Sequence, residues 1–600
     1  MMPWMPQTAV TFRLYLLLAC FAWLFPHFGQ AQDAVVEGKV IDASNGQGLP
    51  FGHVVIKNRP SVISTTNQNG GFSITARAGD TLTVSYVGYR TSHAPIRDVN
   101  SKVLLRLDPR SIAIGTVEIT EESDFLYALL SRSRTSKSPY TEKAKSYLFL
   151  ESAIEGKTTE MIEAYYNGQF KGYDLESLAL KNGRIGLQSF ESQYFINMAS
   201  SRAVMMHALL SQSDYFPESP LGKSKRKLKK TFELTYSNRF KNEQNGVVYQ
   251  IDFRPKENPR RHFEGSVWID SASANIQKIE MQAADTYMHP FVPLFPDAKI
   301  EKIDLFIRKT FTKKGDFMYP REIDFNYEMV YRRANGAMSN IKTKSLLYAF
   351  QYEEEFNLPY IYFPEGMSND YRKINALPQN LYFWSHKPFL FKDEEGKVES
   401  FFNSDSTLLA NDVVYSKMNR RSFFEHPYVI WRGNRIRMRN MERVKQDPIA
   451  LAKQKENCHA EEIDVPIDGY HLEVQLFMDL YDWDDSLYIS TAAIFDPFES
   501  YFYAEHDKTT TVFLNIYFDL AEIQNRKLHQ ALRGVNKVEK AKATYEDINQ
   551  EFKEISKAYF SSVMKGKDRS ALMSWNDLVR EKLGIDNVAI FGLTEDEEEH

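Results

Sequence analysis

The stretch Gly79–Tyr89, with the sequence GDTLTVSYVGY, decides the fold of the N-terminal part of the chain. Apolar and polar residues alternate over positions 82–86, and the same period of two returns over positions 103–107. This period puts one face of each strand inward. Between strands, Asn69–Gly71 supplies residues that tolerate a positive φ. The pattern predicts one compact β-sandwich.

Further motifs surround this stretch in a fixed order. They are GKVID at Gly38–Asp42, Gly46 with Leu49-Pro50, TNQNGGF at Thr66–Phe72, and the pair Gly88-Tyr89. With this order and spacing, Val36–Asp108 resembles the carboxypeptidase regulatory-like domain. Asn67 departs from the family, which usually carries Asp there, but its short polar side chain can still close the turn.

The resemblance implies a fold and a cellular localisation, but it implies no enzymatic activity. In Gram-negative envelope proteins this domain accompanies many secreted and outer-membrane modules, so we expect a cell-envelope protein. An unrelated immunoglobulin-like or fibronectin-like sandwich remains the alternative.

The first thirty residues have the pattern of an export signal. Arg13 precedes an apolar run over residues 14–28, and Gly29-Gln30-Ala31 places small residues where a signal peptidase cuts. Residues 1–31 are therefore predicted to be a signal peptide, with Gln32 near the mature start. Two alternatives stay open: an uncleaved anchor, and a lipobox ending at Cys20 that would leave the protein acylated and tethered to a membrane.

Composition limits the remaining classes. After cleavage only Cys458 would remain, so no intramolecular disulfide could support the fold in an oxidising compartment. Aromatic residues make up 14% of the chain, which supplies ample surface to bury. The formal net charge of -5 is small for 600 residues and argues against nucleic acid as a partner.

Residues 118–352 show a different pattern. A short helix with one apolar face is predicted at 125–130, from Phe125, Leu126, Leu129 and Leu130, followed by a polar connector over 131–145. Alternating strands then follow one another at 247–253, 267–269, 279–281 and 303–307. Many such strands with short turns predict an extended antiparallel sheet.

Three consecutive segments of this region suggest a curved sheet. Val248–Phe253, Gly265–Asp270 and Ile276–Ile279 loosely resemble the half-barrel of periplasmic lipoprotein-carrier proteins. That resemblance implies a concave apolar face, which in the family holds acyl chains. A curved sheet capped by its own helices would give the same pattern.

The C-terminal region, 353–592, matches no family that we recognise. Alternation predicts strands at 472–480 and at 512–518. Apolar spacings of three and four then predict helices at 523–538, at 545–559, and from Leu572 to a stop at Gly584. An acidic tail, 593–600, ends the chain.

Together these patterns predict a mainly β, α+β protein. Its expected parts are the signal peptide 1–31, a seven-stranded-type sandwich at 32–117, an extended antiparallel β domain at 118–352, a mixed region at 353–592 and the tail.

We assign no catalytic, cofactor-binding or metal-binding residue from the sequence. His459 and Glu462 have the His-x-x-Glu spacing of a zinc site, but about one such match is expected by chance in this composition, and catalytic zinc needs a third protein ligand. His529 is the one late candidate for that ligand. Cys458 could act as a thiolate nucleophile only beside a base brought from elsewhere in the chain.

Two charged clusters have alternative interpretations. Asp479, Asp482, Asp484 and Asp485 are dense enough to hold calcium but lack the glycine and final glutamate of an EF-hand loop, so a solvated turn is favoured. Residues 223–230 hold six basic side chains, which could contact an anionic glycolipid or be a basic loop between strands.

We therefore expect a non-enzymatic, exported envelope protein that binds a protein or another envelope component in the periplasm or at the outer membrane. A lipid or glycolipid carrier using the concave sheet is the first alternative. A glycan or peptide hydrolase is the second.

The leader generates a direct test. The mature protein should begin near Gln32 and fractionate with the periplasm or outer membrane, because small residues follow the apolar run. N-terminal sequencing and intact mass check this expectation. A chain that starts at Met1, or lipid on Cys20, would contradict it.

Overall fold

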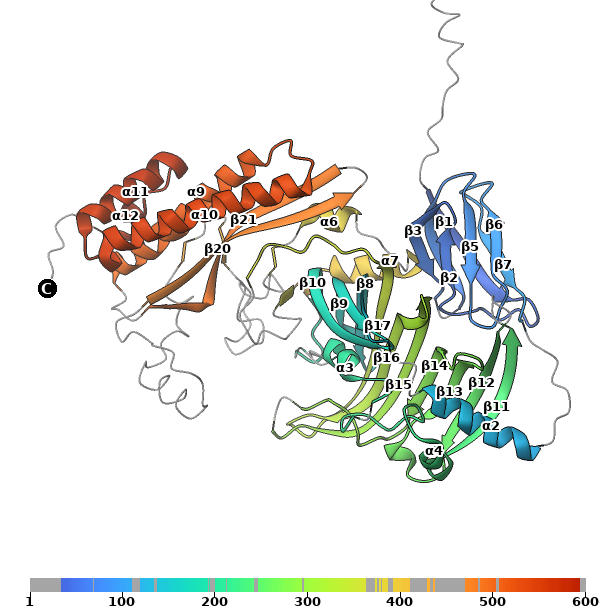
Figure 1. Cartoon of the computed structure of the whole chain (residues 1–600). Helices are drawn as coiled ribbons and strands as arrows, with labels where there is room; N and C mark the ends of the chain where they lie inside the picture. Colours follow the sequence, from blue (N-terminus) through green and yellow to red (C-terminus); the bar gives the residue numbers. More distant parts are fainter. Residues whose placement is uncertain are drawn as a thin grey trace, which may run out of the picture. The chain divides into compact units, whose positions relative to one another are not determined.

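The structure is a computed structural model (Figure 1). It describes residues 34–67, 69–110, 119–133, 138–192, 194, 200–211, 213–241, 246–293, 296–362, 373–374, 377–378, 380–386, 392–409, 429–431, 435–436, 470–483, 486–502 and 507–593. The chain forms two compact units, one within residues 1–109 with 389–395, and one within 110–388 with 396–600. The predicted signal peptide lies outside the described residues, as does the acidic tail apart from Leu593.

The first unit is a sandwich of seven strands, which confirms the predicted fold class. One sheet has the order β4-β1-β7 and the other β3-β2-β5-β6. The strands are β1 (Ala34–Asp42), β2 (His53–Ile56), β3 (Arg59–Thr65), β4 (Gly71–Ala76), β5 (Thr81–Ser85), β6 (Ser92–Pro95) and β7 (Val103–Leu107). All pairs are antiparallel except β1 with β7.

The motif residues of the sandwich have visible structural roles. Asn67 Oδ1 accepts hydrogen bonds from the amides of Asn69 and Gly71, so the asparagine closes the turn between β3 and β4. Gly70 has φ +80°, and a Cβ there would lie 2.3 Å from the carbonyl oxygen of Val40. Only glycine fits this position.

The second unit is built on one sheet of eleven strands. Its order is β11-β12-β13-β14-β15-β16-β17-β8-β9-β10-β18, and every neighbouring pair is antiparallel. The strands are β8 (Thr141–Ile154), β9 (Lys157–Lys171), β10 (Asp174–Leu187), β11 (Phe232–Lys241), β12 (Val247–Pro255), β13 (Glu264–Asp270), β14 (Ile276–Ala283), β15 (Lys299–Lys314), β16 (Phe317–Arg332), β17 (Met338–Tyr352) and β18 (Leu408–Leu409). This arrangement confirms the predicted extended antiparallel sheet.

The sheet bends strongly enough to meet itself. Strands β9 and β10 reach β16 across the inner face, although β17 and β8 separate β16 from β9 within the sheet. At this end Tyr173, in the turn between β9 and β10, accepts a hydrogen bond on its hydroxyl from the amide of Ile276 at 3.0 Å. Register shifts in β8, β10, β15 and β17 supply the bends.

Short helices accompany the sheet. They are α2 (Ile119–Arg132), α3 (Ser200–Met206), α4 (Lys225–Thr231), α6 (Leu381–His386), α7 (Lys392–Phe402) and the 3₁₀ turn η2 (Pro259–Arg261). The helix predicted at 125–130 is present as α2, but Phe125 is exposed and not inward. The predicted connector 131–145 is wrong at its end, because β8 starts at Thr141.

The C-terminal region has its own sheet and helical layer. The sheet order is β19-β21-β20, and its core is shared with the helices. These elements are β19 (Val429–Ile430), β20 (Tyr470–Trp483), β21 (Ser486–Phe502), α9 (Lys508–Ala531), α10 (Val538–Val563), η5 (Met564–Gly566), α11 (Arg569–Leu583) and α12 (Asn587–Phe591). The strand predicted at 472–480 and the helix that stops at Gly584 are confirmed. None of the helices in the described part of the chain is both long and apolar enough to cross a membrane.

The strand predicted at 512–518 is wrong, because these residues lie within the helix α9. Every side chain from Val512 to Phe518 is buried between the small sheet and the other helices, so apolar residues occupy consecutive positions and a period of two fits by accident. Asp507 caps the helix by accepting from the Thr510 amide at 2.7 Å. The helix predicted at 523–538 is likewise split, with Gly534 in the turn between α9 and α10.

A buried ion pair joins the long sheet to the C-terminal hairpin. Lys181 is the extra residue of a bulge in β10, and its ammonium donates to Asp479 and to the Leu480 carbonyl at 2.8 Å. The Asn380 amide donates to the other Asp479 oxygen at 2.6 Å. Both charged side chains are at most 1% exposed.

Removing one partner of this pair should be costly. Asp479→Ala leaves the Lys181 ammonium buried without its counter-charge, so we expect the free energy of unfolding to fall by about 3–5 kcal/mol. Asp482→Ala, an exposed aspartate on the same strand, should change it by about 0.5 kcal/mol or less. Urea unfolding followed by circular dichroism measures both. Equal effects of the two substitutions would contradict a structural role for the pair.

Candidate functional site

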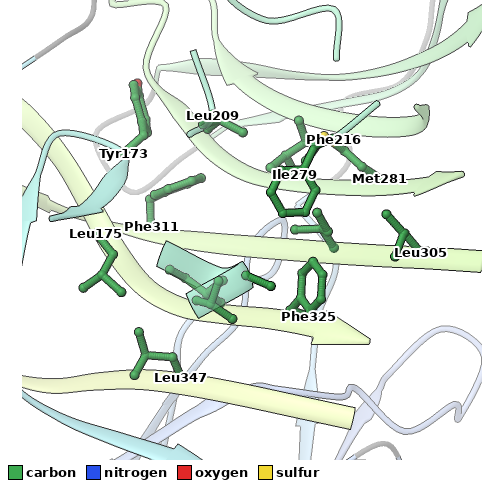
Figure 2. Close-up of a cluster of buried hydrophobic side chains, with 14 of the residues drawn as sticks. Tyr173, Leu175, Leu209, Phe216, Ile279, Met281, Leu305, Phe311, Phe325 and Leu347 are labelled. Atoms are coloured by element: carbon green, nitrogen blue, oxygen red, sulfur yellow. The ribbon is translucent and has the colours of Figure 1, made fainter. Parts of the chain in front are cut away.

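The inner face of the long sheet is a continuous apolar surface. Directly opposed residues on seven neighbouring strands form one cross-strand row, which runs through Met281, Ile307, Phe325, Ser345, Leu150, Ile162 and Ile185. All seven are buried, and Ser345 is the one polar member. Figure 2 shows part of this surface, with Phe325 and Met281 beside Phe216 of another segment. We call this face the bed.

The bed is covered by residues 200–224 of the same chain, which we call the cover. Leu209, Leu210, Phe216 and Leu221 of the cover belong to the same buried cluster as the bed. The Phe216 ring lies 6.0 Å from the Phe325 ring, edge to face. Only the seven residues of α3 are helical in this segment, apart from the residues it leaves undescribed.

A buried lysine ties the cover to the sheet. Lys309 stands on the bed between Ile279 and Ile323, and its ammonium donates to the His207 carbonyl at 3.0 Å. Asp174 lies 3.7 Å from the same ammonium and accepts from the Leu209 amide at 2.7 Å. Burial lowers the pKa of Lys309, and the nearby Asp174 carboxylate opposes that shift.

A polar hollow of about 180 Å³ opens within the cover, and Lys227 of α4 completes its wall. Its wall carries four serines and two lysines, namely Ser211, Ser213, Ser219, Ser224, Lys223 and Lys227. His207 and Phe216 also line it, so the hollow borders the buried cluster under the cover. Burial and the nearby Lys309 charge hold the pKa of His207 well below its usual value.

The basic residues of the cluster 223–230 differ in whether they have a carboxylate partner. Lys225 and Lys229 both pair with Asp124 of α2, and Lys223 pairs with Glu218 at 2.5 Å. Each of these three lysines therefore has a carboxylate partner, and Lys225 and Lys229 share one. Lys227 is exposed and lines the hollow together with Lys223, and no carboxylate partner of Lys227 is found among the described residues.

The chemistry candidates from sequence are not brought together. Cys458, His459 and Glu462 lie outside the described residues, as do Asp484 and Asp485. His529 lies exposed in the last turn of α9. Asp479 is held by Lys181, while Asp482 is exposed. Within the described ranges no group of three or more His, Cys, Asp or Glu side chains could hold a metal ion.

One pair of acids on the sheet has strongly perturbed ionisation. Burial raises the pKa of Glu322 to about 7 and also raises that of Asp324, and the guanidinium of Arg308 opposes both shifts. Arg308 Nη2 lies 3.4 Å from Glu322 and also contacts Asp324. A hydrolase needs its acids around an accessible cleft. These two share a buried ion pair, and neither lines the hollow at His207.

Sequence reasoning missed both Lys309 and His207. A single lysine in an alternating strand is normally predicted to face solvent. An isolated histidine has no second residue at a motif spacing that would mark it as part of a site. One signal was available for Lys309. It falls on the apolar phase of its strand, two residues after Ile307 and two before Phe311, where a charge must be paired.

Comparison with known families identifies part of the chain. A model of the CarboxypepD_reg-like domain matches residues 36–118, which contain all or part of each sandwich strand. The N-terminal unit therefore carries a domain of a regulatory, non-catalytic kind, as the motifs predicted. No curated protein matches the chain.

Solved structures give only a weak likeness. A putative outer membrane lipoprotein-sorting protein domain from Vibrio parahaemolyticus shows 10% identity and a TM-score of 0.17, and the match covers 40% of this chain and 94% of that one. A LolA superfamily protein from Nitrosomonas europaea shows 9% identity and a TM-score of 0.14, covering 38% and 90%. At these scores the function must be argued from the geometry alone.

The Lys309 contact predicts the mobility of the cover. In Lys309→Met the His207 carbonyl loses its donor, which costs about 1–3 kcal/mol of local stability. Amide hydrogen exchange across residues 200–211 should therefore become at least tenfold faster, as measured by mass spectrometry. Lys313→Met is the matched control, because Lys313 is exposed on the same strand. Unchanged exchange in Lys309→Met would show that the contact does not hold the cover.

Proposed function

We propose that this protein is a non-enzymatic, exported binding protein whose long sheet takes up an acyl chain between the bed and the cover. The observation that carries the proposal is the nature of the cover. The middle of a strongly curved apolar face is closed by a short segment with one seven-residue helix, while the 14-residue helix α2 packs near β11 at one edge of the sheet.

Such a cover can open at moderate cost. Isolated helices shorter than about 12–15 residues are marginal in water, so α3 depends on its contacts with the sheet. Local opening has a lower free energy than global unfolding when few contacts are involved. An opened α3 segment exposes the apolar bed, and a ligand of matching character can then replace Leu209 against it.

The energy of an acyl chain is sufficient for this exchange. Burial of one methylene contributes about 0.8 kcal/mol, so ten methylenes contribute about 8 kcal/mol before ordering costs. That gain exceeds the cost of breaking the Lys309 contact and one or two hydrogen bonds of about 1 kcal/mol each, together with about 1.5–3 kcal/mol for exposing Leu209. The bed extends over seven neighbouring strands and so offers room for a long chain.

The N-terminal part of the chain supports an envelope setting. The apolar leader supports export, and the CarboxypepD_reg-like domain supports a protein-binding or regulatory module in the same chain as the long sheet. We place the protein in the periplasm, with association to the outer membrane through a protein partner. The described residues offer no acid pair or metal cluster in a cleft that favours the hydrolase alternative.

A large side chain introduced into the bed should weaken the binding of an acyl chain. Ala283 lies buried on the bed at the end of β14, and Ala283→Phe places a ring where the chain would lie. We expect the affinity for a fluorescent fatty acid, cis-parinaric acid, to fall at least tenfold. Gln282→Phe adds the same ring at the neighbouring exposed position and should leave the affinity within twofold. Fluorescence titration of the full mature chain measures both.

Thermal melting of each variant shows whether the fold is retained. Organic extracts of protein purified from envelopes should in addition contain about one acyl lipid per chain by mass spectrometry. Wild-type protein that neither binds the probe nor carries lipid would overturn the proposal.

A further inference from the structure

The hollow at His207 is lined by serine hydroxyls whose protons have no acceptor among the residues that the structure describes. The hydroxyls of Ser213, Ser219 and Ser224 accept from the amides of Tyr215, Leu221 and Lys227, respectively. Each hydroxyl still has its own proton to give. No acceptor for these three protons is found in the described part of the chain.

Charge in the hollow is positive once its internal pairs are counted. Glu218 is the one acid among the lining residues, and Lys223 neutralises it at 2.5 Å, with Arg261 at 3.7 Å. The ammonium of Lys227 has no carboxylate within reach among the described residues. A ligand that enters therefore meets one uncompensated positive charge and several O–H donors.

His207 also lines the hollow, and it brings a buried polar atom that has no partner among the described residues. Its side chain is only 6% exposed, and its Nδ1 is enclosed without a hydrogen-bond partner among the described residues. The ring packs edge to face on Phe216 at 5.1 Å and on Phe263 at 6.1 Å, so it cannot turn outward without breaking these contacts. A buried polar atom without a partner costs about 1–3 kcal/mol, which a bound ligand would relieve.

The donor set selects among ligands. An oxyanion with several acceptor oxygens can accept from serine hydroxyls and an ammonium at once, and phosphate groups have this property. A neutral sugar would leave the positive charge of Lys227 uncompensated, whereas an oxyanion neutralises it. A volume of about 180 Å³ is far more than one water needs.

We propose that this hollow binds a phosphate group, and that in a lipid the phosphate sits at Lys227 and the serines while the acyl chain lies on the bed. The lipid part of this proposal rests on the proposed function. Phe216 makes the connection, because one ring both lines the hollow and packs on Phe325 of the bed. Head and chain of one molecule could then be held side by side.

The test uses the full mature chain and isothermal titration calorimetry with three probes. These are dihexanoyl phosphatidic acid, inorganic phosphate and the phosphate-free dihexanoylglycerol. Lys227→Gln should weaken phosphatidic acid binding at least tenfold, because a hydrogen bond to a charged group is lost. Lys230→Gln is the matched control, since it removes an equal charge from an exposed position of α4 outside the hollow, and it should stay within twofold.

The probes separate the two sources of phosphate. Phosphatidic acid that binds at least tenfold tighter than inorganic phosphate, with both weakened by Lys227→Gln, supports a lipid headgroup. Equal binding of the two, again weakened by Lys227→Gln, supports a site for free phosphate. The inorganic probe does not need the bed, so it can succeed even if the fatty-acid titration fails.

Two results would overturn the inference. One is phosphatidic acid and dihexanoylglycerol binding equally while inorganic phosphate gives no heat. The other is Lys230→Gln weakening binding as much as Lys227→Gln, which would reduce the effect to general surface charge. Ser219→Ala supplies a second variant, and it should weaken binding of inorganic phosphate about threefold or more.

Discussion

The turn between β9 and β10 constrains the whole second unit, because it holds the long sheet in its bent form. Tyr173 accepts from the first amide of β14 and packs edge to face on Phe311 at 5.0 Å. These contacts join strands that are far apart within the sheet order. A flat sheet of the same strands would have no inner face to enclose, so both the bed and its cover depend on this closure.

The closure also explains why a charged residue can stand on an apolar face. Lys309 lies near the bent end, where the Asp174 carboxylate and the His207 carbonyl come within reach of its ammonium. An unpaired ammonium buried there would be very costly. These groups hold one end of the cover, and a β-bridge between Glu218 and His262 holds the other end. The sheet and its cover are therefore joined by apolar contact with a polar tie near each end of the cover.

The hairpin of β20 and β21 has a different role, because it serves two cores at once. Leu476 and Met478 face the C-terminal helices, while Phe477 belongs to the core of the long sheet. A strand buried on both sides must satisfy any polar residue within it, and Asp479 does so through Lys181 and Asn380. The C-terminal helical layer is thereby attached to the sheet through a strand and not through a flexible linker.

The sequence alone determined the elements in which one face is buried and the other solvated. An element with one buried face has apolar residues at a regular spacing in the sequence. For this reason we could predict the sandwich, the strands from 247 to 307 and the helix ending at Gly584. Glycine and asparagine turns such as Asn67 added a second local signal. Only the tertiary structure decided the rest. Burial on all sides erased the helical period of α9, and the pairing of Lys309 with His207 and Asp174 joins residues that are distant in sequence. Periodicity reports burial of a single face, and it carries no information about which distant groups that face brings together.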